Sequence, residues 1–211
     1  MDWSTLKTDV ADYLARTDLP VTLVPKLINQ ALHKVERMFD WNHMEVKTTG
    51  TVTASSDTIA VPTRYKNTKV LFVTIDSEQR EMKKVDYKFL HSQFPLGSSS
   101  PSAPEMFALL QGDGYFYLRP YPDTTYSYTF ITRRYSADLS DANTSNWFME
   151  NAWEVLFYGA LLLAEPYLKN PSDMPIWEKF YTETINELIG VSIVEETEGS
   201  YQNVATTLLV V

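Results

Sequence analysis

The segment from Asn146 to Gly190 constrains the fold more than any other part of the chain. Its pattern predicts two consecutive helices joined by a short turn that contains proline. The first helix is apolar nearly all round, the second is amphipathic, and the pair carries almost no basic residues. A helix with so little polar surface is normally surrounded by protein. In a chain of 211 residues, we expect other copies of the chain to supply part of that protein.

Two helical segments flank a β-rich segment. Residues 1–45 show two apolar stripes at helical spacing, and Pro25 suits the first turn of the second helix. Residues 46–139 contain about six or seven short β-prone runs separated by turn signals. Residues 140–190 return to helix, and Gly190 fits a C-terminal cap.

The order of these segments predicts an α+β fold. The simplest architecture is a four-helix bundle formed by residues 1–45 and 140–190. Residues 46–139 would form a β-sandwich-like or barrel-like module inserted between the second and third helices, with a short helix from Val85 to Phe94 inside it. Residues 191–211 are left as an extended C-terminal arm.

Charge and composition exclude several classes of protein. Residues 140–211 hold 11 acidic and 2 basic residues, a net charge of −9 that equals the charge of the whole chain. An acidic surface repels nucleic acid, so a sequence-specific DNA reader is not expected. The absence of cysteine excludes disulfides and thiolate metal sites. The apolar run from Leu156 to Ala164 is far shorter than the roughly 20 residues that span a bilayer, and the amino terminus lacks signal-peptide features.

The sequence contains no catalytic motif. GxSxG, Walker and GxGxxG patterns are absent, and His33, His43 and His91 lack the spacing of a zinc helix. Glu183 and Glu187 lie one helical turn apart, which is more typical of a solvated helix face than of acid–base catalysis. We therefore expect a non-enzymatic protein with no cofactor and no metal site.

Tyrosines alternate with other residues in two of the β-prone runs. These tyrosines are Tyr115, Tyr117, Tyr126 and Tyr128. On one face they could form a sugar-stacking platform, so an alternative function is a glycan-binding or glycan-cleaving module. An ordinary sandwich core or a cross-strand ladder explains the pattern as well or better. A cellular oligomeric scaffold is a third hypothesis.

The carboxyl end is apolar and β-prone. The run from Val204 to Val211 follows an acidic stretch and has no charged side chain. Such a segment left free favours aggregation, so it either folds back as a strand of its own chain or docks on a partner. Docking is slightly favoured. The residues expected to dock are Tyr201, Val204, Leu208, Leu209 and Val210.

Residues across most of the chain resemble a known family. The matching residues are Leu139-Ser140, Asn143 to Trp147, Leu156 to Leu161, Ala164 to Leu168, Trp177 and Tyr181, with Ala60 to Pro62 before Tyr65 and Tyr117 to Pro122 in the β-rich segment. They are similar to the head–tail adaptor proteins of tailed bacteriophages, also called connector, head-completion or tail tubular proteins. Ala152 departs from the family, which usually has proline there.

The resemblance implies a structural protein of the virion. Such adaptors form a ring, usually of twelve copies, beneath the portal vertex, and DNA passes through the lumen. The implied partners are other copies of the chain, the portal protein, which the C-terminal arm commonly contacts, and downstream tail, nozzle or fibre proteins. Glu183 and Glu187 are expected to line an acidic lumen without binding DNA specifically. The residues expected at bundle and oligomer interfaces are Trp147, Trp153, Leu156, Tyr158, Leu162, Trp177, Phe180 and Tyr181.

Overall fold

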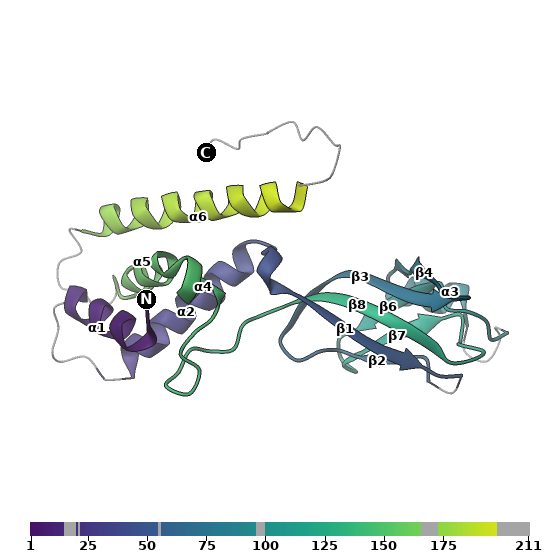
Figure 1. Cartoon of the computed structure of the whole chain (residues 1–211). Coiled ribbons are helices and arrows are strands. Elements are labelled where there is room, and N and C mark those ends of the chain that lie inside the picture. Colours follow the sequence, from purple (N-terminus) through teal and green to yellow (C-terminus); the bar gives the residue numbers. More distant parts are fainter. Residues whose placement is uncertain (15–19, 21, 55, 96–99, 166–172, 198–211) are drawn as a thin grey trace. The chain divides into compact units, whose positions relative to one another are not determined.

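The chain forms two compact units. The structure, a computed structural model, describes residues 1–14, 20, 22–54, 56–95, 100–165 and 173–197. These residues form six α-helices, one short 3-10 helix and eight strands, which confirms the predicted α+β fold (Figure 1). We call residues 1–43 and 137–211 the helical unit and residues 44–136 the β unit.

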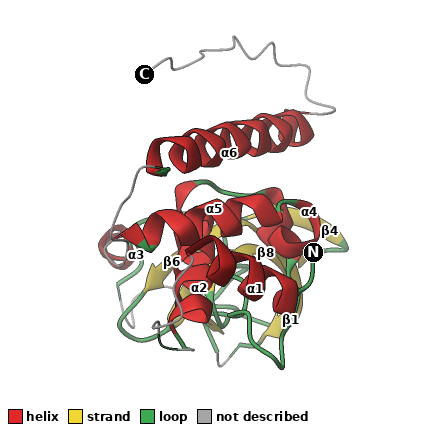
Figure 2. Cartoon of the chain, turned by 90° about the vertical axis from the view of Figure 1, so that its left-hand side faces the viewer, coloured by secondary structure: helices red, strands yellow, loops and turns green. Residues whose placement is uncertain are grey.

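The helical unit is built around α5. Its described helices are α1 (Trp3–Leu14), α2 (Leu23–Met38), α4 (Trp147–Asn151), α5 (Trp153–Leu163) and α6 (Met174–Thr197). A 3-10 helix, Asn42–Met44, follows α2. α5 packs against each of the other four helices. Figures 1 and 2 show α6 on one side of α5, with α1 and α2 on the other. None of the described helices combines the length and apolar character that a membrane span requires.

The burial of α5 follows from its apolar sequence. Its buried residues are Val155, Leu156, Phe157, Gly159, Ala160 and Leu161. Gly159 permits a close approach of α2, because a Cβ built there would lie 2.9 Å from Ala31 Cβ and 3.1 Å from Tyr181 Cε2. Helices of the same chain therefore supply much of the protein that the sequence predicted around this helix.

The prediction that the last helix ends at Gly190 was wrong. α6 continues through Gly190 to Thr197. A glycine inside a helix costs about 1 kcal/mol, which does not end a helix that gains contacts further on. Ser192 is buried, and its carbonyl accepts a hydrogen bond of 2.9 Å from Asn42 Nδ2. The predicted arm, residues 191–211, therefore loses its first seven residues to α6.

The β unit consists of two antiparallel-rich sheets. Its strands are β1 (Glu45–Val52), β2 (Thr58–Ala60), β3 (Tyr65–Ile75), β4 (Glu78–Glu81), β5 (Lys83–Lys84), β6 (Met106–Leu110), β7 (Tyr115–Arg119) and β8 (Tyr126–Arg134). One sheet has the order β1-β8-β3-β4 and the other β2-β7-β6-β5. The predicted short helix is confirmed as α3 (Tyr87–Gln93), which begins after Asp86, whose side chain accepts a bond of 2.8 Å from Lys88 N.

Both sheets contribute to one apolar core. Its nine buried residues are Val52, Ile59, Leu71, Val73, Met82, Phe107, Phe116, Leu118 and Phe130. The described residues form no closed barrel, because β1 and β4 end one sheet and β2 and β5 end the other. The barrel-like alternative was therefore wrong.

Substitution of glycine by alanine should have opposite effects on the free energy of unfolding at two positions in the helices. A Cβ at Gly190 would meet nothing within 4 Å, so Gly190→Ala should raise the free energy of unfolding by about 1 kcal/mol. Gly159→Ala pushes a Cβ against Ala31 and Tyr181, and overpacking of about 1–3 kcal/mol should outweigh the gain in helix propensity. Urea unfolding of both variants measures the two effects. A Gly159→Ala chain more stable than the wild type would contradict the close approach of α2 and α5.

Candidate assembly surfaces of the helical unit

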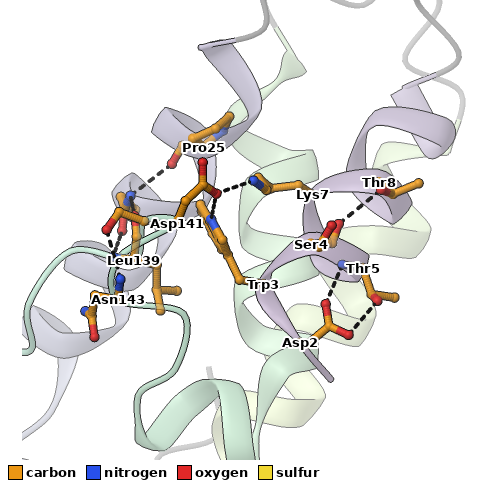
Figure 3. A network of polar contacts seen from close by, with 12 residues as sticks. Asp2, Trp3, Ser4, Thr5, Lys7, Thr8, Pro25, Leu139, Asp141 and Asn143 are labelled. Atoms are coloured by element: carbon orange, nitrogen blue, oxygen red, sulfur yellow. Dashed lines mark hydrogen bonds and ion pairs between the residues drawn. The ribbon is translucent and has the colours of Figure 1, made fainter.

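A polar network fixes the loop before α4 to α1 and α2 (Figure 3). The Asn29 side chain donates to Leu139 O at 2.9 Å and accepts from Leu139 N at 2.8 Å. The Asp141 carboxylate accepts from Lys7 Nζ at 2.7 Å and from Trp3 Nε1 at 3.0 Å. The bond from Lys7 holds the pKa of Asp141 below its usual value. Through these contacts the returning chain is attached to the first two helices.

Residues that carry the family resemblance shape the same loop. Ser140 and Asn143 exchange backbone hydrogen bonds of 2.9 and 3.1 Å, and Asn143 Nδ2 donates to Asp138 O at 2.8 Å. Asn146 caps α4, because its side-chain oxygen accepts a bond of 2.9 Å from Met149 N. These polar residues therefore set where the second group of helices begins.

One exposed flank of α6 carries a row of apolar and acidic residues, which we call the α6 stripe. Its members are Ile176, Phe180, Glu183, Glu187, Val191 and Val194. They lie on one flank because they recur at spacings of three or four residues. Ile176, Val191 and Val194 are more than half exposed, at 53, 56 and 57%. A different face of α6, with Trp177, Tyr181 and Ile185 buried, packs on its own chain.

A line of aromatic contacts links the α6 stripe to α5 and α1. The rings of Phe180 and Tyr158 stack with centroids 5.4 Å apart. Phe157 lies edge-on to Tyr13, with centroids 5.1 Å apart. Burial, together with nearby Tyr13 and Glu154, raises the pKa of Tyr158. Since 63% of Tyr13 is exposed, three helices present aromatic surface on this part of the unit.

α2 presents a row of basic and polar residues, which we call the α2 stripe. Its members are Lys26, Gln30, His33 and Arg37, and only His33 is half-buried rather than exposed. The acidic residue of α2, Glu36, is fully buried and adds nothing to this surface. Lys7, Asp138 and Asp141 join the first three members around a groove of about 520 Å³. His33 Nε2 lies 2.8 Å from the carboxylate of Asp138.

Comparison with known protein families identifies the chain. It matches the family described as SU10 adaptor protein over residues 1–207. This chain belongs to the SU10 adaptor protein family. The match confirms the resemblance to phage adaptors and indicates a structural, non-enzymatic protein of the virion. A comparison with curated proteins found no significant match.

The residues predicted at bundle and oligomer interfaces occupy different environments in this adaptor. Leu156, Trp177 and Tyr181 are buried within the helical unit. The half-buried ones are Trp147, Trp153, Tyr158 and Leu162. Trp147 stacks on His43 with ring centroids 4.0 Å apart. Phe180 is exposed and lies in the α6 stripe. Their role between subunits stays a prediction.

The other predicted functional residues divide between α6 and the chain beyond it. Glu183 and Glu187 are exposed in the middle of the α6 stripe. Tyr201, Val204, Leu208, Leu209 and Val210 lie outside the described residues. Among the residues that the structure describes, no group of three or more histidine and acidic side chains could hold a metal ion.

The four tyrosines of the glycan hypothesis do not share a face. Tyr115 and Tyr117 lie in β7, whereas Tyr126 and Tyr128 lie in β8 of the other sheet. The rings of Tyr126 and Tyr128 pack against the apolar core of the β unit. The Tyr126 hydroxyl donates to Asp123 at 2.6 Å, a bond that raises the pKa of Tyr126 to about 12. The four rings therefore do not form one stacking platform, and the sandwich-core explanation holds for Tyr126 and Tyr128.

Sequence reasoning missed most of the two stripes. Of their members, only Phe180, Glu183 and Glu187 were expected at an interface or a lumen. The spacing of Lys26, Gln30, His33 and Arg37 was available as a pattern. From the sequence alone, this spacing looks the same as an ordinary solvated helix face. The burial of the other α2 residues is needed to tell the two apart.

Asn29→Ala should destabilise the adaptor. The substitution removes both side-chain bonds to Leu139 and leaves the backbone N–H and C=O of Leu139 without these partners. The free energy of unfolding should therefore fall by about 1–3 kcal/mol. Asn151→Ala is the matched control, because Asn151 is exposed and its amide bonds only Trp147 O in its own helix. Its effect should stay within about 0.5 kcal/mol. Equal stabilities of the two variants in thermal unfolding would contradict the anchoring role of Asn29.

Proposed function

We propose that this adaptor assembles as a ring of twelve copies beneath the portal vertex and joins the capsid to the tail. DNA would pass through a channel in the ring. Its partners would be other copies of the chain, the portal protein and downstream tail, nozzle or fibre proteins. The observation that carries the proposal is the match to the SU10 adaptor family over residues 1–207.

The exposed surfaces of the helical unit support assembly. Contiguous exposed apolar surface is typical of interaction sites, and the α6 stripe has such surface near both ends, at Ile176 with Phe180 and at Val191 with Val194. A ring needs contacts between different surfaces of neighbouring copies. The α6 stripe and the α2 stripe are two chemically different surfaces on one unit.

The finer architecture belongs to the same proposal. We infer that α1, α2, α5 and α6 form a four-helix bundle, and that the β module is inserted between α2 and the helices that follow it. The burial of α5 against the other helices supports the bundle. The bundle domain would comprise residues 1–45 with 140–197, because α6 extends beyond the predicted boundary at Gly190 to Thr197, and residues 46–139 would form the inserted domain.

Two further elements complete the proposed assembly. Acidic side chains would line the DNA channel, where carboxylates let the phosphate backbone pass without adhesion. The arm that follows α6 would dock on the portal. Its apolar composition, from Val204 to Val211, supports a partner-bound segment.

Mixing the adaptor with the portal protein of the same phage tests the ring. Native mass spectrometry should detect one adaptor copy for each portal subunit, and electron microscopy should show a closed twelve-fold ring. A monomeric state of the chain alone agrees with the proposal, because a portal can template assembly. An adaptor that stays unbound at micromolar portal concentration would contradict the proposal.

Removing residues 198–211 should weaken portal binding. Several apolar side chains would lose their buried site, and each contributes about 1.5–3 kcal/mol, so a loss of affinity of tenfold or more is expected. A chain ending at Thr197 keeps all of α6, so its thermal unfolding should match that of the full chain. The readout is the dissociation constant for the portal. An unchanged constant would rule out the arm as the portal contact.

A further inference from the structure

We propose that neighbouring adaptor copies are joined by the α6 stripe of one copy against the α2 stripe of the next. This inference rests on the proposed ring and names the surfaces that close it. It assigns Glu183 and Glu187 to the contact between copies instead of the channel surface expected from the sequence. The partner is a second copy of this chain. Charge complementarity, the spacing of the two stripes and their places in the helical unit carry the inference.

The two helices carry opposite charge on their exposed surfaces. α6 holds five glutamates and one lysine, Lys179, which lies 3.8 Å from Glu183. α2 exposes Lys26, Lys34 and Arg37, while its one acidic residue, Glu36, is buried. A basic surface lets an acidic chain contact its own copies without like-charge repulsion. The two carboxylates that border the α2 stripe, Asp138 and Asp141, are already paired with His33 and Lys7. Among the described helices of the helical unit, α2 is the one whose exposed charges are all basic.

The stripes also match in length and pattern. Lys26, Gln30, His33 and Arg37 have the spacing i, i+4, i+7, i+11. The first four members of the α6 stripe, from Ile176 to Glu187, have the same spacing. Rows at i, i+4 spacing on two helices can interdigitate. The aliphatic stems of lysine and arginine can cover exposed apolar side chains while their charged ends reach carboxylates.

The positions of the helices suit a ring. α6 lies on one side of α5, and α2 lies on the other (Figures 1 and 2). Pairing two different surfaces of one chain gives a heterologous contact, which generates a ring when the rotation closes. The groove of about 520 Å³ beside Lys26 and His33 offers room for side chains of the next copy.

Charge reversal on either stripe tests the pairing in the mixture with portal. Lys26→Glu with Arg37→Glu should reduce the yield of complete rings at least about tenfold, and Glu183→Lys with Glu187→Lys should do the same, because like charges then face each other. Mixing the two variants should restore rings in which the variants alternate, because every contact then pairs opposite charges, and one chain carrying all four substitutions should restore rings as well. Restoration separates a direct contact from two independent defects.

Glu178→Lys with Glu196→Lys is the matched control. Both glutamates are exposed on α6, and the charge change is the same, but they lie outside the α6 stripe. This variant should form rings in wild-type yield. If the stripe reversals also form rings in wild-type yield, the inference is overturned while the proposed function stands. If the wild-type chain forms no ring with the portal, both fail.

Cross-linking gives a second measurement that leaves every charge in place. The chain has no cysteine, so introduced pairs are unique. Gln30→Cys with Val191→Cys places one thiol on each stripe, and a bismaleimide should give a ladder of multimers on a denaturing gel. Gln30→Cys with Ile193→Cys is the control, since Ile193 is exposed on α6 outside the stripe. Ladders of equal intensity from the two double variants would overturn the pairing. Cross-linking of these thiols to the portal protein or to DNA instead of a second copy would overturn it as well.

Discussion

The burial of α5 is the constraint on which the rest of the helical unit depends. An apolar helix must be covered, and four helices of the same chain contact it. Gly159 sets the distance to α2, because a side chain there would collide with Ala31. Trp177, Tyr181 and Ile185 on α6 complete the cover. Once α5 is enclosed in this way, the flanks of α2 and α6 that face away from it stay exposed, and these are the faces that we propose for contacts between chains.

This arrangement gives structural roles to residues that look functional in the sequence. The conspicuous polar residues of the resemblance, Asn143 and Asn146, close a loop and cap a helix. In the β unit, the buried Arg119 guanidinium pairs with Asp57 and stacks on the Tyr121 ring with 3.9 Å to the centroid. These contacts satisfy buried polar groups, as a folded core requires. The residues available to partners are then apolar or charged side chains on helix flanks.

The sequence predicted elements well where periodicity and turn chemistry agreed. The helical stripe of α2, the short helix after Asp86 and the alternation in β8 follow local rules and appear as expected. Predictions failed where tertiary contacts decided the outcome. Gly190 looked like a helix end until the contact between Asn42 and Ser192 favoured continuation. For the tyrosines of β7 and β8, a shared cross-strand ladder was wrong because the two strands belong to different sheets, whereas the sandwich-core explanation was confirmed for Tyr126 and Tyr128. Sheet membership depends on pairing between distant segments, which periodicity does not encode.

The uneven charge adds a final constraint on assembly. A chain with a net charge of −9 is repelled by its own copies at long range, and salt screens this repulsion beyond about 8 Å at physiological ionic strength. Close pairs between Lys or Arg and Glu are screened less when they are partly buried. Moderate salt therefore removes more of the repulsion than of the attraction between stripes. An acidic chain with one basic helix face can thus stay dispersed when free and still associate where a template brings copies together.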